Sequence, residues 1–211
     1  MIIYGNMRYE DFLTVIQKYP LFGDEVLLSL GETPSNCRLQ LTRWAQKGKV
    51  LRLKRGLYTL PAHLSKIPFS LRWLANTLYS PSYISLEYAL SLYDLIPERV
   101  HPVTSVTLLK TAKFSNPLGI FAYRHIKKEL FFGFTETKDE HQRLILTATP
   151  EKALLDYVYY FPRWQSTSEF LEESIRLQGL ENLSKKWLRK YADRFQSKKI
   201  AGAAQLFLKR M

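Results

Sequence analysis

Cysteines and long apolar runs are almost missing from this chain of 211 residues. The single cysteine, Cys37, excludes an internal disulfide and a zinc site built from several cysteines. No stretch approaches the ~20 apolar residues that a membrane-spanning helix needs. Residues 1–6 lack the basic segment and apolar run of a signal peptide. We therefore expect a protein of the reducing cytoplasm that has no membrane partner.

Motifs of enzymes and cofactor sites are missing too. The glycines form neither a GxGxxG motif nor a P-loop, and no histidine takes part in an HxH or HExxH spacing. Glu151 and Asp156 lie five positions apart, which is too far around a helix for a paired-carboxylate site. We expect no enzyme, no metal and no cofactor, and metal-free chemistry using His125 or Glu151 is the alternative that these residues leave open. The four histidines are His63, His101, His125 and His141.

Acidic residues are absent from one long segment. Residues 33–86 contain nine lysines or arginines and no aspartate or glutamate, whereas residues 87–180 contain eleven basic and twelve acidic residues. After Leu180 there are nine basic and two acidic residues, and the chain carries a net charge of +12. Such blocks attract polyanions, although an ordinary solvated face is the alternative interpretation.

The N-terminal part of the chain shows a pattern of secondary structure. A helical apolar stripe covers residues 9–19, and a short apolar segment covers Asp24 to Leu30. Thr33 and Pro34 are typical of a helix start, and Gly48 of its end. Two short strand-like runs follow, separated by Lys54-Arg55-Gly56, which predicts a hairpin.

Three helices followed by a basic hairpin are typical of a winged helix-turn-helix, which we predict for residues 1–65. In that fold the second helix of the motif enters the major groove, where arginine reads guanine and asparagine or glutamine reads adenine. Cys37, by contrast, lies on the apolar stripe with Leu41 and Trp44 and is predicted to be a small buried hydrophobic residue. The predicted DNA contacts are Ser35, Asn36, Arg38, Gln40, Thr42, Arg43, Lys47, Lys49, Arg52, Lys54 and Arg55.

Residues 66–211 are predicted to form a second domain, so that the whole fold is α+β. We expect a mixed α/β arrangement with a small, mainly antiparallel sheet and C-terminal helices. In the last helix, Trp187 is expected to point inward while the cations face water. That basic tail could be a solvated helix, a second DNA contact or a docking face for an acidic partner. The predicted strands are Val103–Leu109, Ile120–Ile126, Leu130–Thr135 and Arg143–Thr147, and the predicted helices are about 69–78, 86–95, 149–161, 168–178 and 184–195.

Five segments between about Val26 and Phe161 occur in an order that resembles a known family. These are Gly48–Tyr58, Tyr83–Leu90, Leu95–Glu98, Tyr123–Ile126 and Ala148–Asp156. In them the chain resembles the AbiEi-type antitoxins, which are transcriptional regulators of viral-defence (abortive infection, type IV toxin–antitoxin) systems. No motif of that family matches the residues from Trp164 onward.

The resemblance implies an antitoxin that is encoded beside a nucleotidyltransferase-type toxin. It also implies autorepression through binding of the N-terminal winged helix to the protein's own promoter. The C-terminal domain would then confer antitoxicity, without a stable complex with the toxin being required. Two other functions stay open: a stand-alone winged-helix transcription factor whose C-terminal domain senses a ligand or dimerises, and a module whose winged helix binds protein rather than DNA.

Overall fold

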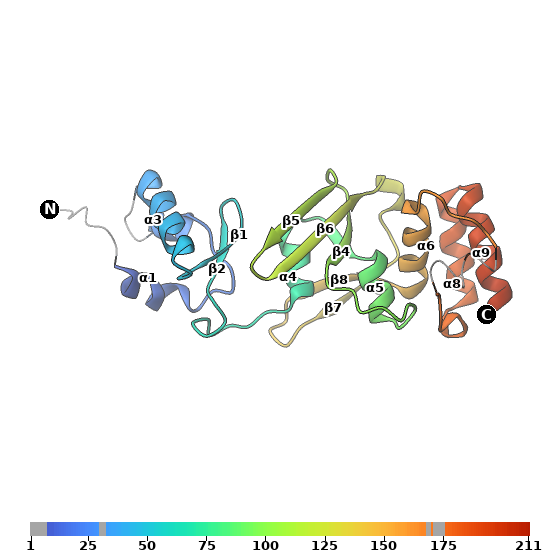
Figure 1. Cartoon of the computed structure of the whole chain (residues 1–211), viewed down its shortest axis with the longest axis horizontal. Coiled ribbons are helices and arrows are strands. Elements are labelled where there is room, and N and C mark those ends of the chain that lie inside the picture. The colour runs from blue at the N-terminus through green and yellow to red at the C-terminus, as the bar shows by residue number, and fades with distance from the viewer. Residues whose placement is uncertain (1–7, 30–32, 168–169, 171–175) are drawn as a thin grey trace. The chain divides into compact units, whose positions relative to one another are not determined.

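Two compact units make up the protein in a computed structural model that describes residues 8–29, 33–167, 170 and 176–211. The N-terminal unit extends to Ser70 and includes residues 114–119, and the C-terminal unit consists of residues 71–113 and 120–211. The fold is mixed α+β, as the sequence predicts, with a two-stranded antiparallel sheet, a six-stranded sheet and helices at the C-terminus (Figure 1).

The N-terminal unit contains three helices and a hairpin in the predicted order. Two residues define the start of α3. The Thr33 hydroxyl caps the helix by accepting a hydrogen bond from the Asn36 backbone N–H, and Pro34 occupies the first turn. At the hairpin turn, Gly56 has φ of 73°, a left-handed conformation that glycine adopts without strain. The elements are α1 (Tyr9–Ile16), α2 (Glu25–Ser29), α3 (Pro34–Gln46), β1 (Leu51–Lys54) and β2 (Leu57–Thr59).

A small core joins these elements. Phe12 and Ile16 of α1 are buried against Cys37 and Leu41 of α3, at the helical spacing that the sequence shows. Trp44 is half-buried at the edge of this core, with its ring centroid 4.7 Å from that of Phe12. Cys37 is fully buried, which confirms that it is a small core residue.

The buried thiol of Cys37 leads to a simple prediction. An aromatic disulfide reagent should react with it on the order of a hundredfold more slowly in the native protein than in denaturant, because reaction requires local unfolding. The release of the coloured thiolate measures both rates. Equal rates in the two conditions would show that the core around α3 is open.

The six-stranded sheet has the order β5–β6–β4–β3–β8–β7 and belongs to the C-terminal unit, apart from residues 114–116 of β5 and Gly119 of β6. The prediction of a small, mainly antiparallel sheet is confirmed only in part, because the sheet is mixed. β3 pairs antiparallel with β4, and β7 with β8, but β3 pairs parallel with β8, and β4 with β6. The strands are β3 (Ser82–Ile84), β4 (Val103–Thr107), β5 (Ala112–Asn116), β6 (Gly119–His125), β7 (Phe134–Lys138) and β8 (Leu144–Ala148).

Two strands were not predicted from the sequence, and a third was misplaced. β3 has only three residues, all buried, so it shows no alternation, and β5 is largely polar. The strand expected at Leu130–Thr135 begins later, at Phe134, because a 3₁₀ turn, η1 (Lys128–Leu130), precedes it.

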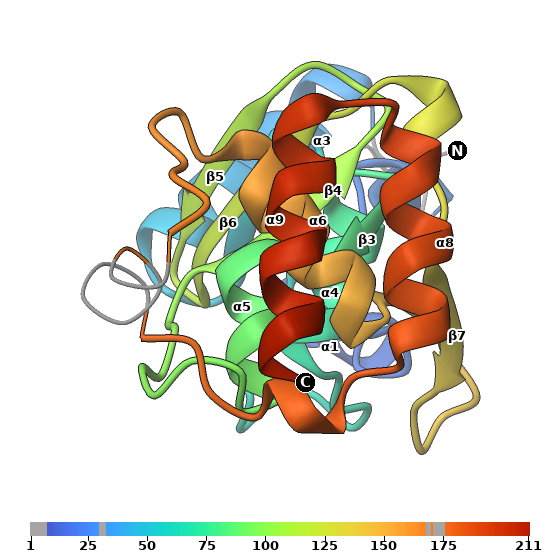
Figure 2. The same ribbon diagram turned by 90° about the vertical axis from the view of Figure 1, so that its right-hand side faces the viewer.

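Helices complete the C-terminal unit. α6 packs against α5 and also against α8 and α9, which run side by side in Figure 2. Among the described residues, no helix has both the length and the apolar character needed to cross a membrane. The helices are α4 (Leu71–Leu78), α5 (Leu86–Leu92), α6 (Pro150–Tyr160), α8 (Lys185–Phe195) and α9 (Lys198–Arg210), with a 3₁₀ turn, η3 (Leu180–Asn182), before α8.

The C-terminal helices differ from the prediction in two respects. α9 was not predicted, although Ile200, Ala203, Ala204 and Phe207 form a helical stripe and are all buried. Trp187 does not point inward as expected, since it is 41% exposed on α8. Most of the helix predicted at 168–178 lies outside the described residues.

Candidate nucleic-acid interface and a buried polar cluster

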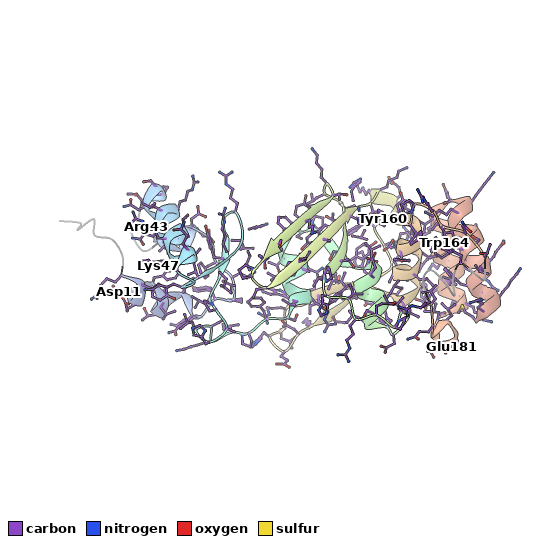
Figure 3. All side chains as sticks on the ribbon, viewed as in Figure 1. Asp11, Arg43, Lys47, Tyr160, Trp164 and Glu181 are labelled. Atoms are coloured by element: carbon purple, nitrogen blue, oxygen red, sulfur yellow. The ribbon has the colours of Figure 1, made fainter. Side chains whose placement is uncertain are left out.

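α3 has one packed face and one solvent-facing face. Cys37 and Leu41 are buried in the core, and the helical period places most predicted contacts on the other side. Figure 3 shows Arg43 and Lys47 at this helix, and both residues are exposed. Six of the predicted DNA contacts on α3 or directly after it are exposed: Ser35, Asn36, Arg38, Thr42, Arg43 and Lys47.

Gln40 departs from the predicted set of DNA contacts. It is 7% exposed, because it lies three residues after Cys37 and directly before Leu41, on the packed side of α3. The sequence pattern had placed Gln40 off the apolar stripe, with an amide that can pair with adenine, and its burial shows that this placement is wrong. We therefore leave Gln40 out of the exposed face.

Two other side chains of α3 already have partners within the unit. The Arg38 guanidinium lies 3.5 Å from a carboxylate oxygen of Asp24, but 73% of the Arg38 side chain is exposed. An exposed ion pair of this kind contributes only about 0–1 kcal/mol, so it can exchange for a pair with a ligand. The Thr42 hydroxyl donates to the Arg38 carbonyl over 2.7 Å, which leaves its oxygen as an acceptor.

The hairpin and its approach carry the remaining predicted cations. Arg52 and Arg55 are exposed, whereas Lys54 is half-buried. The Lys49 ammonium lies 4.3 Å from the centroid of the Tyr9 ring, and the Tyr9 hydroxyl donates to the Lys49 carbonyl over 2.8 Å. These contacts fix the segment between α3 and the hairpin against α1.

A third extended segment pairs with the hairpin. The Phe22 N–H donates to the Tyr58 carbonyl over 3.0 Å, and the Tyr58 N–H donates to the Phe22 carbonyl over 2.8 Å. The Thr59 hydroxyl also donates to the Pro20 carbonyl over 2.7 Å. β2 is therefore tied to the chain between α1 and α2, and this holds the hairpin in a fixed position on the N-terminal unit.

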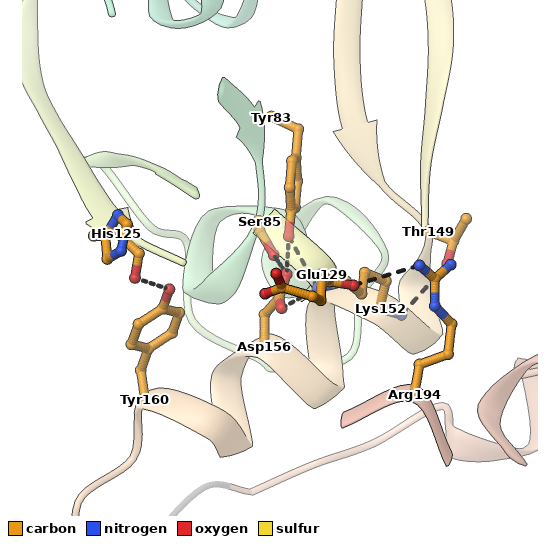
Figure 4. Close-up of polar contacts among 9 residues, drawn as sticks. All are labelled: Tyr83, Ser85, His125, Glu129, Thr149, Lys152, Asp156, Tyr160 and Arg194. Atoms are coloured by element: carbon orange, nitrogen blue, oxygen red, sulfur yellow. Dashed lines mark hydrogen bonds and ion pairs between the residues drawn. The ribbon is translucent and has the colours of Figure 1, made fainter. Parts of the chain in front are cut away.

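A polar cluster that the sequence analysis missed lies inside the C-terminal unit. The Lys152 ammonium forms an ion pair with Asp156 and donates to the Tyr83 hydroxyl over 2.9 Å (Figure 4). The other Asp156 oxygen accepts hydrogen bonds from the Tyr83 hydroxyl, at 2.9 Å, and the Ser85 hydroxyl, at 2.8 Å. Ser85 precedes α5, but its hydroxyl bonds to Asp156 instead of capping that helix.

Burial determines the titration of this cluster. It lowers the pKa of Lys152 and raises the pKa of Asp156, while the attraction between the two charges opposes both shifts. Burial, followed by the Asp156 charge, raises the pKa of Tyr83 well above its usual value. All four side chains are 0% exposed, so no substrate reaches them in this structure. The cluster is therefore a structural feature, in which each buried polar group is satisfied by the others.

No known protein family matches the chain, and no curated protein has a significantly similar sequence. The resemblance to the AbiEi-type antitoxins therefore stays a prediction.

Over the part of the chain that the structure describes, no three histidine, cysteine or acidic side chains are grouped so that they could hold a metal ion.

Proposed function

We propose that the N-terminal unit is a winged helix-turn-helix domain that binds double-stranded DNA. The recognition helix is α3, and the wing is the β1–β2 hairpin. The pairing of Phe22 with Tyr58 supports this proposal, because it ties the hairpin to the segment between α1 and α2 and so holds a wing against its helices. The observation that carries the proposal is the exposed cationic surface of α3 and the hairpin, in a segment without acidic residues.

The residue types on this surface suit a duplex. The first turn of α3 offers the side chains of Ser35 and Asn36, which bind phosphate or base edges. Arg43 and Lys47 lie further along α3 and neutralise phosphates, as does Arg55 at the hairpin turn. Phosphate contacts set the position of the domain, while Asn36 and Arg38 supply base contacts.

In the cell, we propose that the protein is a cytoplasmic autorepressor and the antitoxin of a nucleotidyltransferase-type toxin. This part of the proposal is supported by the sequence resemblance alone. The C-terminal unit would then confer antitoxicity. Expression of the C-terminal unit together with the toxin of the neighbouring gene separates the antitoxin role from DNA binding, and cell growth is the readout.

DNA binding itself is tested with the duplex upstream of the protein's own gene. We expect preferential binding over an unrelated duplex of equal length, and a slope of log K against log salt of about −4 to −5, because ~4–6 phosphates are neutralised. Fluorescence anisotropy across a salt series measures both quantities. Equal, salt-sensitive binding to both duplexes would reduce the interaction to polycation attraction, and absence of binding would favour a protein-binding module.

One observation favours a second candidate function, a stand-alone transcription factor that senses a ligand. The C-terminal unit contains a cavity of about 440 Å³, a volume within the range of ligand sites. A gene neighbourhood without a nucleotidyltransferase, together with no rescue of growth, would favour this function over the antitoxin.

A further inference from the structure

The cavity of the C-terminal unit is formed where five parts of the chain meet. Its walls come from the start of α5, the strands β4 and β6, the segment 96–102 and α6. Half of the ten lining residues are polar or charged, namely Glu87, Glu98, Thr104, Arg124 and Tyr157. The apolar lining residues are Leu86, Ile96, Val100, Pro102 and Ala122.

Two opposite charges in this lining have no partner among the described residues. Within the described ranges, neither the Glu87 carboxylate nor the Arg124 guanidinium takes part in a hydrogen bond or an ion pair. Glu98 differs, because its carboxylate forms an ion pair with Arg176. The Thr104 hydroxyl is also occupied, since it donates to the Ser85 carbonyl over 2.7 Å. Glu87 and Arg124 are therefore the groups that a ligand can pair with.

The cavity wall also places one of these charges, Glu87, near the Tyr157 hydroxyl. Burial raises the pKa of the Tyr157 hydroxyl and the negative charge of Glu87 adds to the shift, so Tyr157 stays a neutral donor next to this carboxylate. Leu86, at the start of α5, has φ of 59°, a left-handed conformation that is costly for a residue with a side chain. Residues in such strained conformations persist only where the surrounding structure holds them in place, and they are concentrated at binding sites.

We propose that this cavity binds a small zwitterion with an apolar body, namely a free α-amino acid with an aliphatic or aromatic side chain. Arg124 pairs with the ligand carboxylate in a charge-assisted, bidentate hydrogen bond, which suits the planar guanidinium. Glu87 accepts hydrogen bonds from the ligand ammonium, and the apolar lining covers the ligand side chain. The inference concerns the C-terminal unit alone and does not depend on DNA binding.

The test uses L-leucine and L-phenylalanine as probes and isothermal titration calorimetry of the full chain. We expect saturable binding of at least one of them. For that amino acid, the N-acetyl derivative, which lacks the ammonium, and the amide, which lacks the carboxylate, should each bind on the order of ten- to a hundredfold more weakly. Glu87→Gln and Arg124→Gln should weaken binding of the parent amino acid to a similar extent.

The matched control is Arg163→Gln, which changes an exposed arginine of the same unit that does not line the cavity. It should leave binding unchanged, and circular dichroism confirms that every variant is folded. Absence of binding by both amino acids would overturn the proposal. Equal affinity for the parent and both derivatives, or for wild type and the Glu87 and Arg124 variants, would overturn it as well. None of these outcomes bears on binding of the promoter duplex.

Discussion

Replacement of Asp156 by leucine is expected to lower the free energy of unfolding by about 3–5 kcal/mol. Asp156 accepts from the ammonium of Lys152 and from the hydroxyls of Tyr83 and Ser85, all of them buried. Without the carboxylate, the Lys152 ammonium keeps only the Tyr83 oxygen and the faces of aromatic rings around it, among them Phe132 at 4.9 Å. Urea denaturation followed by far-UV circular dichroism measures the loss.

Two further variants distinguish the effect of leaving a buried charge unpaired from the effect of changing the shape of a side chain. The double variant Lys152→Met with Asp156→Leu removes both charges, and it should recover most of the stability that the single variant loses. Asp193→Leu changes an exposed carboxylate of α8 and should have little effect. A single variant as stable as wild type, or a double variant that is less stable than the single one, would contradict the assignment of Lys152 and Asp156 as a coupled buried pair.

Reversal of two charges on the proposed interface should weaken binding to the promoter duplex on the order of a hundred- to a thousandfold. The variant is Arg43→Glu with Arg55→Glu, one on α3 and one at the hairpin turn, both exposed. Each substitution removes a phosphate contact and adds repulsion, so the salt dependence should also become shallower by about two contacts. Fluorescence anisotropy at several salt concentrations measures the affinity and the slope.

Lys18→Glu provides the matched control, because Lys18 is an exposed cation of the same unit that lies on neither α3 nor the hairpin. It changes the net charge in the same direction, and we expect only a small loss of affinity from it. If this control weakened binding as strongly as a reversal at Arg43 or Arg55, long-range attraction would explain the binding. The recognition helix would then have to be sought elsewhere.

The helices with strong local start signals could be predicted from the sequence. Thr33-Pro34 and Thr149-Pro150 each combine a capping hydroxyl with a proline in the first turn, and both helices begin where these signals lie. The pairing of Phe22 with Tyr58 could not be predicted, because a single bridging residue leaves no period in the sequence.

The buried cluster shows why the site chemistry was harder to predict. Lys152 and Asp156 have the i, i+4 spacing of an ordinary surface ion pair on a helix. Only the packing of α6 against its neighbours buries them, and that packing involves α9, which was not predicted. Gln40 illustrates the same limit on α3, since its residue type indicated a base contact and its position around the helix placed it in the core.

The sequence separation within the buried cluster has a consequence for synthesis on the ribosome. Asp156 bonds to residues 73 and 71 positions earlier in the chain, Tyr83 and Ser85. At ~5–20 residues per second, several seconds pass between their translation and that of Asp156. During that time β3 also lacks β8, its neighbour on one side. A nascent chain of this length therefore exposes an unpaired strand edge, and interruption of translation before α6 is complete leaves a fragment prone to aggregation and degradation.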